Sequence, residues 1–148
     1  MNQRTKKIIT RVWSIFTYNK FTPWIPVAVW MSVIFIASSI TLTEGVSPFT
    51  YADKIVHFLE FGILGFFLYF ALYASNPDSS YKLRIFISTF FTGLYGLSDE
   101  IHQLFVPTRE FSIYDLLADI AGALFFSYVA YICQKNIFAL FANRRHNR

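Results

Sequence analysis

Residues 83–105 read LRIFISTFFTGLYGLSDEIHQLF, an apolar run that closes with two carboxylates and an imidazole. A helix needs about 20 mostly apolar residues to cross the hydrocarbon core of a bilayer, and this stretch is long enough. Three further stretches meet the same requirement: 24–42, 55–73 and 114–132. None of the four alternates strictly in the manner of a barrel strand, and breakers such as Gly45, Pro48 and Pro77 lie between them. The sequence therefore predicts an all-α, polytopic membrane bundle with four transmembrane helices.

The composition of the whole chain favours the same class. Of its 148 residues, 55% are hydrophobic and 15% are charged. A typical soluble domain is about 25% charged, and a domain this small has too much surface to cover with fewer charges. The same figures exclude a disordered chain, and a net charge of +4 in separated clusters argues against nucleic-acid binding. We therefore expect membrane lipids, and not nucleic acid, as partners.

The N-terminal segment differs from the rest of the chain. Bases alternate there with apolar residues at the spacing of a basic amphipathic helix, which would lie in the membrane interface. The apolar run that follows is long and starts late for a signal peptide, so we expect the segment to remain uncleaved. The chain then divides into an amphipathic segment (1–22), a four-helix transmembrane domain (23–133) and a basic cytoplasmic tail (134–148).

The distribution of charges orients the bundle. Lysine and arginine concentrate on the cytoplasmic side of membrane proteins. With both termini in the cytoplasm, eleven of the thirteen bases lie inside, and only Lys54 and Arg109 lie outside. Of the nine acids, only Asp78 lies inside. The sequence thus predicts a multi-pass protein of the cytoplasmic membrane whose polar residues gather at the outward-facing end.

The deep polar residues of that end are the candidate site. A carboxylate such as Glu60, two turns into a helix, costs a few kcal/mol unless it is paired or hydrated. Asp99 and Glu100 end a helix where negative charge opposes the helix dipole, so local helix stability does not explain them. Asp119 lies one turn beyond the first turn of its helix and has no capping role. The complete set is His57, Glu60, Asp99, Glu100, His102, Asp115 and Asp119.

Structural interpretations remain open for several of these residues. His57 and Glu60 share a helix face and would form an ion pair that holds helices together. Asp53 and Asp115 each stand at the third helical position of a capping box, which begins with Thr50 in one case and Ser112 in the other.

Arg109, the only outer-loop arginine, has two interpretations as well. It would clamp a phosphate or carboxylate, or it would pair with Glu110 or Asp115. The glycines of the helices would serve as close-packing positions.

Mixed carboxylates and imidazoles suit two kinds of chemistry. One is coordination of a divalent metal such as Zn or Mn, although no HExxH or CxxC spacing is present. The other is general acid–base catalysis without a metal. The cofactor therefore stays undetermined, with a divalent metal as one option. The metal candidates are His57, Glu60, Asp99, His102 and Asp119.

Three ordered blocks of the sequence resemble the signatures of the VanZ-like membrane protein family. They are DKIVHFLEF at 53–61, SDEIHQLFVPTR at 98–109, and the acids and small residues of 115–122. The family is named for a member linked to resistance to the glycopeptide teicoplanin. The resemblance implies a small bacterial multi-helix membrane protein, and it carries over no general biochemical activity.

The matching positions give the expected site. The residues expected to act as acid–base or metal-binding groups are His57, Glu60, Asp99, Glu100, His102 and Asp119. The residues expected to bind the substrate are Lys54, Gln103, Arg109 and Asp115.

Three functions remain open at this point. The first is an enzyme, a hydrolase or transferase that acts on a lipid or lipid-linked cell-wall precursor at the outer leaflet. The second is a non-catalytic protein that binds glycopeptides or shields their target. The third is a small transporter or proton relay, against which the confinement of the ionisable residues to one leaflet argues.

Overall fold

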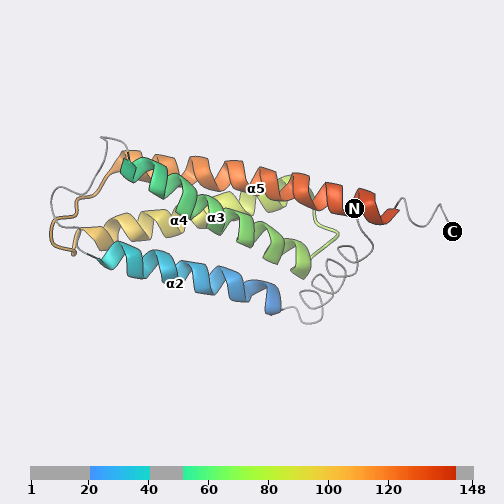
Figure 1. The fold of residues 1–148 in the computed structure, drawn as a ribbon, viewed down its shortest axis with the longest axis horizontal. Helices are drawn as coiled ribbons and strands as arrows, with labels where there is room; N and C mark the ends of the chain where they lie inside the picture. The colour runs from blue at the N-terminus through green and yellow to red at the C-terminus, as the bar shows by residue number, and fades with distance from the viewer. Residues whose placement is uncertain (1–20, 41–51, 143–148) are drawn as a thin grey trace.

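The computed structural model describes residues 21–40 and 52–142, with side chains up to residue 137. Within these ranges the chain contains helices and no strand. A 3₁₀ turn, η1 (Thr22–Trp24), leads into α2 (Ile25–Ser39), followed by α3 (Ala52–Ser75), α4 (Tyr81–Gln103) and α5 (Ile113–Ala142). The four α-helices run side by side along one long axis (Figure 1). The predicted all-α bundle is confirmed.

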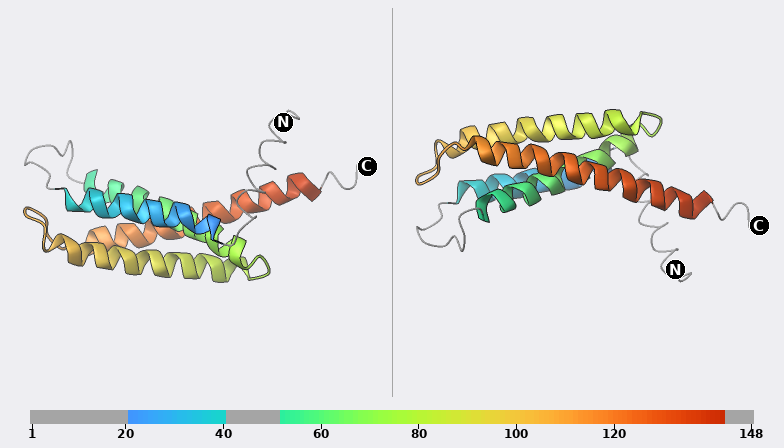
Figure 2. Two further views of the ribbon diagram at one scale, coloured as in Figure 1. Left: turned by 90° about the horizontal axis from the view of Figure 1, so that it is seen from below. Right: turned by 90° about the horizontal axis from the view of Figure 1, so that it is seen from above.

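Each predicted span corresponds to one of these helices, and apart from the end of α5 their ends shift by no more than three residues. Pro23 and Pro26 stand in the first turns of η1 and α2, where a missing N–H costs nothing. Ser80 caps α4, and its side chain accepts a hydrogen bond from the backbone N–H of Lys82 at 3.3 Å. α5 continues to Ala142 and projects beyond the other helices (Figure 2), so the expected boundary at 133/134 does not coincide with a helix end. The predicted amphipathic segment and the Thr50 cap lie outside the described residues.

Among the described residues, three segments are long and apolar enough to cross a membrane: Thr22–Ser39, Ala52–Ser75 and Ile113–Ile137. They agree with three of the four predicted spans and indicate a membrane protein. α4 is not apolar enough to belong with them. It carries Lys82 and Arg84 near its start and Asp99 and Glu100 near its end.

The polarity of α4 is nevertheless inverted relative to a helix of a soluble protein. Its buried residues are mostly polar: Arg84, Ser88, Thr92, Gly96, Asp99, Glu100 and Gln103. Its exposed large side chains are mostly apolar: Leu83, Phe86, Phe90, Phe91, Leu94, Leu97 and Ile101. A soluble helix buries its apolar stripe and exposes its polar face. The low overall hydropathy of α4 therefore comes mainly from the polar side chains that face the other helices.

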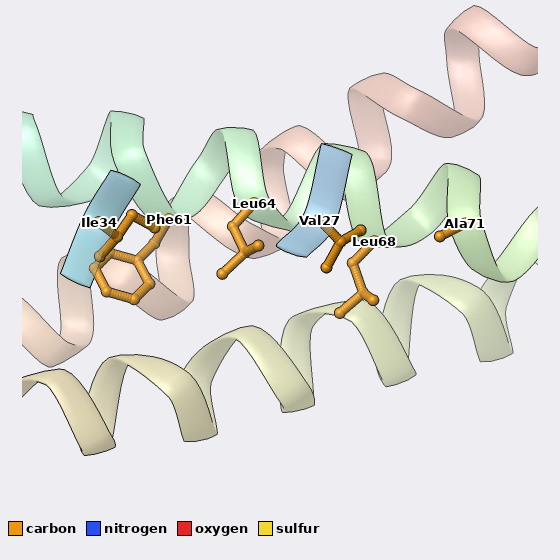
Figure 3. Close-up of a cluster of buried hydrophobic side chains, with 6 residues drawn as sticks. All are labelled: Val27, Ile34, Phe61, Leu64, Leu68 and Ala71. Carbon is orange, nitrogen blue, oxygen red and sulfur yellow. The ribbon is translucent and has the colours of Figure 1, made fainter. Parts of the chain in front are cut away.

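An apolar core joins α2 to α3. Val27 and Ile34 of α2 pack with Phe61, Leu64 and Leu68 of α3 (Figure 3). Two hydrogen bonds reinforce this packing. The Trp30 indole Nε1 donates to the backbone oxygen of Glu60 at 2.8 Å, and the Tyr95 hydroxyl of α4 donates to the backbone oxygen of Met31 at 2.7 Å. α2 is thereby attached to both neighbouring helices.

The most extensive helix pair is α3 with α5, and glycines set its spacing. A Cβ added at Gly65 would lie 2.9 Å from the backbone of Ala123. A Cβ added at Gly122 would overlap the backbone carbonyl of Phe58. Small residues let helix backbones approach closely and gain van der Waals contact. This approach brings the N-terminal turns of α3 and α5 together, and with them the candidate site.

We predict that Gly122→Ala destabilises the bundle by about 1–3 kcal/mol, because the added methyl meets rigid backbone of α3. The matched control is Gly93→Ala, whose Cβ would meet only the Ile120 side chain, at 3.1 Å. Thermal unfolding of the purified protein in detergent measures both. Equal melting temperatures for the two variants would contradict the role given to Gly122.

Candidate functional site

The polar cluster lies at the end of the bundle where α3 begins, α4 ends and α5 begins (Figure 1, left). The first turns of α3 carry Lys54 and His57, and the last turn of α4 carries Glu100. The first two turns of α5 carry Asp115 and Asp119. Each of these side chains therefore comes from a helix and not from a loop, which fixes its position well.

His57 is paired with Asp119. Its Nδ1 lies 3.0 Å from Asp119 Oδ1, and both residues are buried. Phe61 stacks on the imidazole, with ring centroids 5.9 Å apart and planes within 3°. The partner of His57 thus comes from α5, so the interpretation of a His57–Glu60 pair within α3 is wrong.

Gly96 provides the space for the Asp119 carboxylate. A Cβ at this position would lie 2.6 Å from Asp119 Oδ2. Gly96 stands one turn before Glu100 on the buried face of α4. The sequence suggested only a packing role for this glycine, because nothing in its neighbours shows which side chain it faces.

Glu100 and Asp119 are fully buried, and each has one carboxylate oxygen with a partner and one without. Glu100 Oε2 accepts a hydrogen bond from the backbone N–H of Ser112 at 2.7 Å. Glu100 Oε1 and Asp119 Oδ2 have no hydrogen-bond partner. A buried polar atom left unpaired costs free energy, more so when it is charged. These two oxygens are therefore the most unusual atoms of the cluster.

A second ion-pair group closes the cluster toward the helix ends. Lys54 Nζ lies 2.7 Å from Asp53 Oδ2 and 2.9 Å from Asp115 Oδ1. Asp115 is thereby tied to α3, while Ser112 caps α5 by accepting from the Asp115 N–H at 3.3 Å. The predicted capping box is half formed, because Glu100, and not Asp115, accepts from the Ser112 N–H.

Asp99 and Gln103 pair within α4. The Gln103 amide donates to Asp99 Oδ2 at 2.9 Å, and both residues are buried. This bond spans one helical turn and occupies the amide predicted to bind a substrate.

His102 lies apart from the cluster. Its Nε2 is 3.0 Å from the Ser39 hydroxyl, and its ring lies 4.8 Å from the Phe35 ring, so it faces α2. Sequence spacing placed His102 with Asp99 on one stripe of α4. In the structure, Asp99 is hydrogen-bonded to Gln103 within α4, whereas His102 faces α2.

Arg109 and Glu60 lie at the edge of the site. Within the described residues, Arg109 forms no ion pair with Glu110 or with Asp115, whose charge is taken by Lys54. Glu60 is half-buried, and Arg109 lies among the charged groups around it. The residue before Arg109, Thr108, adopts φ 68°, a left-handed conformation that is unusual for threonine. Arg109 is thus not engaged in either of the ion pairs expected from the sequence.

Within the described residues, one group of side chains with metal-ligand atoms lies close together, and it differs from the predicted one. His57, Glu100 and Asp119 each offer a ligand atom within 4.8 Å of the others. Of the five residues expected from the sequence, this group contains His57 and Asp119, and it adds Glu100. Glu60, Asp99 and His102 are not part of it. Whether Asp99 or Glu100 points toward His57 depends on how α4 is rotated about its axis in the bundle. The spacing of residues in the sequence does not give that rotation.

Fold and site together define a helical membrane protein with a buried histidine–carboxylate cluster at one end. The VanZ/LLP1 family model matches residues 9–134, most of the chain. The chain therefore belongs to the VanZ/LLP1 family, as the three sequence blocks suggested. No curated protein and no solved structure matches it.

We predict strong energetic coupling between His57 and Asp119. Either His57→Leu or Asp119→Leu should destabilise the protein by about 3–5 kcal/mol, because each leaves a buried partner unpaired. The double variant should lose clearly less than the sum of the two, which unfolding in detergent measures as a double-mutant cycle. The same cycle with Glu60→Leu in place of Asp119→Leu is the control. A larger coupling to Glu60 than to Asp119 would refute the assignment.

Proposed function

We propose that the protein is an enzyme of the bacterial cell envelope that acts on a lipid or lipid-linked cell-wall substrate at the outer leaflet. The observation that carries this proposal is the buried group formed by His57, Glu100 and Asp119, with two carboxylate oxygens left unpaired. Ionisable residues inside membrane helices are expensive, and they mark functional sites more often than structural ones. A bundle built only for stability would have no need of this cluster.

The residues divide into roles on the basis of their contacts. His57 is held at Nδ1 by Asp119 and, together with Glu100, forms the reactive group of the site. Arg109 binds the anionic part of the substrate at the edge of the site. Lys54 and Asp115 neutralise each other and fix α3 against α5. His102 is assigned to the α2 contact and not to the chemistry.

The membrane topology that places this site outside has four spans and both termini in the cytoplasm. The inverted polarity of α4 supports α4 as a span in addition to the three apolar ones, since its exposed large side chains are mostly apolar. The preponderance of bases at the opposite end supports the orientation.

An apolar cavity favours a lipid over a water-soluble substrate. It has a volume of about 420 Å³, within the range of ordinary ligand pockets, and lies between α2, α3 and α4. Its lining includes Ala28, Met31, Leu64, Leu68 and Tyr95. Leu64 and Tyr95 each stand one helical turn inward of a site carboxylate, Glu60 and Asp99 respectively. An alkyl chain in this cavity would direct its headgroup toward the site.

Proton or ion passage is a second candidate, and a buried polar stripe along α4 favours it. Ser88 is hydrogen-bonded to Ser127 at 2.8 Å, and Thr92 is fully buried one turn further toward the site. Arg84 lies buried at the other end of the stripe. Ser88→Ala and Thr92→Val separate the two functions, since a relay needs these hydroxyls and the enzyme does not.

We predict that reporter fusions at Pro107 read as external and fusions at Ser79 as internal. The bases near the α3–α4 link retain it in the cytoplasm, whereas the α4–α5 link carries one arginine, directly followed by Glu110. Activity of paired cytoplasmic and periplasmic reporters measures this. An external signal at Ser79 would reverse the orientation and remove the site from the outer leaflet.

We predict that His57→Gln and Glu100→Gln abolish function while the protein still accumulates in the membrane. In cells that lack the native chain, the readouts are the envelope lipid profile and glycopeptide sensitivity, each normalised to protein abundance. Asp53→Asn is the matched control, because this acid lies at the same end of the bundle but is exposed. Full activity of both site variants would contradict an enzyme.

A separate pair of variants tests whether the cavity holds part of the substrate. Ala28→Trp should fill the cavity and lower activity, because Ala28 lines it. Val29→Trp, on the exposed face of the same helix, should leave activity unchanged. Equal activity of the two variants would argue against an alkyl chain in the cavity.

A further inference from the structure

We infer that His57, Glu100 and Asp119 form a binding site for a divalent transition-metal cation. The inference concerns the same site as the proposed enzyme and adds a cofactor to it. It rests on the proposed function only for what the cation would do, and not for whether the cation binds.

The first support is geometric. The three residues come from three different helices, and one ligand atom of each lies within 4.8 Å of the other two. Ligands about 2.1 Å from a metal are separated by roughly 3–4 Å from one another. Small rotations of the side chains would therefore bring these atoms to coordination distance without movement of a helix.

The second support comes from the unpartnered oxygens. Glu100 and Asp119 are 0% exposed, and both Glu100 Oε1 and Asp119 Oδ2 lack a hydrogen-bond partner. Their other oxygens are held by the Ser112 N–H and by His57. The Glu100 carboxylate is thus oriented by a backbone hydrogen bond while its other oxygen is free, and Asp119 also keeps one free oxygen, an arrangement that suits metal ligands.

The third support is the charge of the surroundings. Six carboxylates lie at this end of α3, α4 and α5: Asp53, Glu60, Asp99, Glu100, Asp115 and Asp119. The permanently charged bases near them are Lys54 and Arg109, and Lys54 is already shared by Asp53 and Asp115. The six carboxylates outnumber Lys54, Arg109 and His57 together. A bound dication would balance the charge of the acids.

The donor set indicates the kind of cation. One imidazole nitrogen with two carboxylate oxygens suits Zn²⁺ or Mn²⁺, whereas Ca²⁺ and Mg²⁺ prefer oxygen ligands alone. Three protein ligands also leave a coordination position open, as in catalytic zinc sites. Gly96 fits this assignment, since a side chain there would press on Asp119 Oδ2.

The test is metal uptake by the full-length chain in detergent. The protein is stripped with a chelator, exposed to Zn²⁺ or Mn²⁺, freed of excess ion and analysed for bound metal, with the melting temperature recorded in parallel. The wild type should retain one ion per chain and melt at a higher temperature when it is loaded.

His57→Gln, Glu100→Gln and Asp119→Asn should each weaken metal affinity by about tenfold or more. One acid of the same end serves as the control: exposed Asp53, changed to Asn, whose carboxylate is paired with Lys54. This variant should bind metal as the wild type does. Glu100→Gln keeps the shape of the side chain, and circular dichroism verifies that each variant is folded.

The outcomes separate this inference from the proposed function. No uptake by the wild type, unchanged uptake by all three ligand variants, or an equal loss in Asp53→Asn would overturn the metal site. Metal bound through the three residues without any lipid-directed activity would support the site and refute the enzyme. Activity that survives complete removal of metal would refute the site as a catalytic cofactor site and leave the enzyme standing.

Discussion

The close approach of α3 and α5 is the contact on which the rest of the structure depends. Gly65 and Gly122 leave no room for a side chain between the two backbones. At this distance His57 of α3 reaches Asp119 of α5 directly, and Lys54 reaches Asp115. In an apolar environment no hydrophobic force drives helices together, so van der Waals contact and polar pairs must do so. Packing and site are therefore consequences of the same glycines.

The buried charged side chains of the bundle lie at its two ends. At one end, Arg84 donates to the Ser79 carbonyl at 2.6 Å and lies over the rings of Tyr69 and Tyr73. Arg84 thus contacts both oxygen atoms and aromatic rings, and these contacts hold the α3–α4 link in place. At the other end, Glu100 and Asp119 keep free oxygens in a fully buried place. Arg84 Nε also lacks a hydrogen-bond partner, so the two ends differ in the kind of group left unpaired: a guanidinium nitrogen at one end and two carboxylate oxygens at the other.

Several elements of the site followed from the sequence and others did not. The depth of Glu60 and Asp119 along their helices follows from a rise of about 1.5 Å per residue, so their presence at one end was predictable. The Ser112 cap was also predictable, because a capping serine acts within its own turn. The partner of His57 was not. Spacing within α3 offered Glu60, whereas the structure supplies Asp119 from 62 residues away.

The sequence by itself determined that this chain forms apolar helices with their acids at one end, and that it belongs to the VanZ/LLP1 family. Length, composition and motif order are properties of the chain alone, so they can be read without knowledge of how the helices pack. Only the tertiary structure decided that Glu100 joins His57 while His102 turns to α2. Helical positions two residues apart differ by about 200° in direction. The rotation of α4 that decides which of them faces His57 is set by its contacts with α3 and α5.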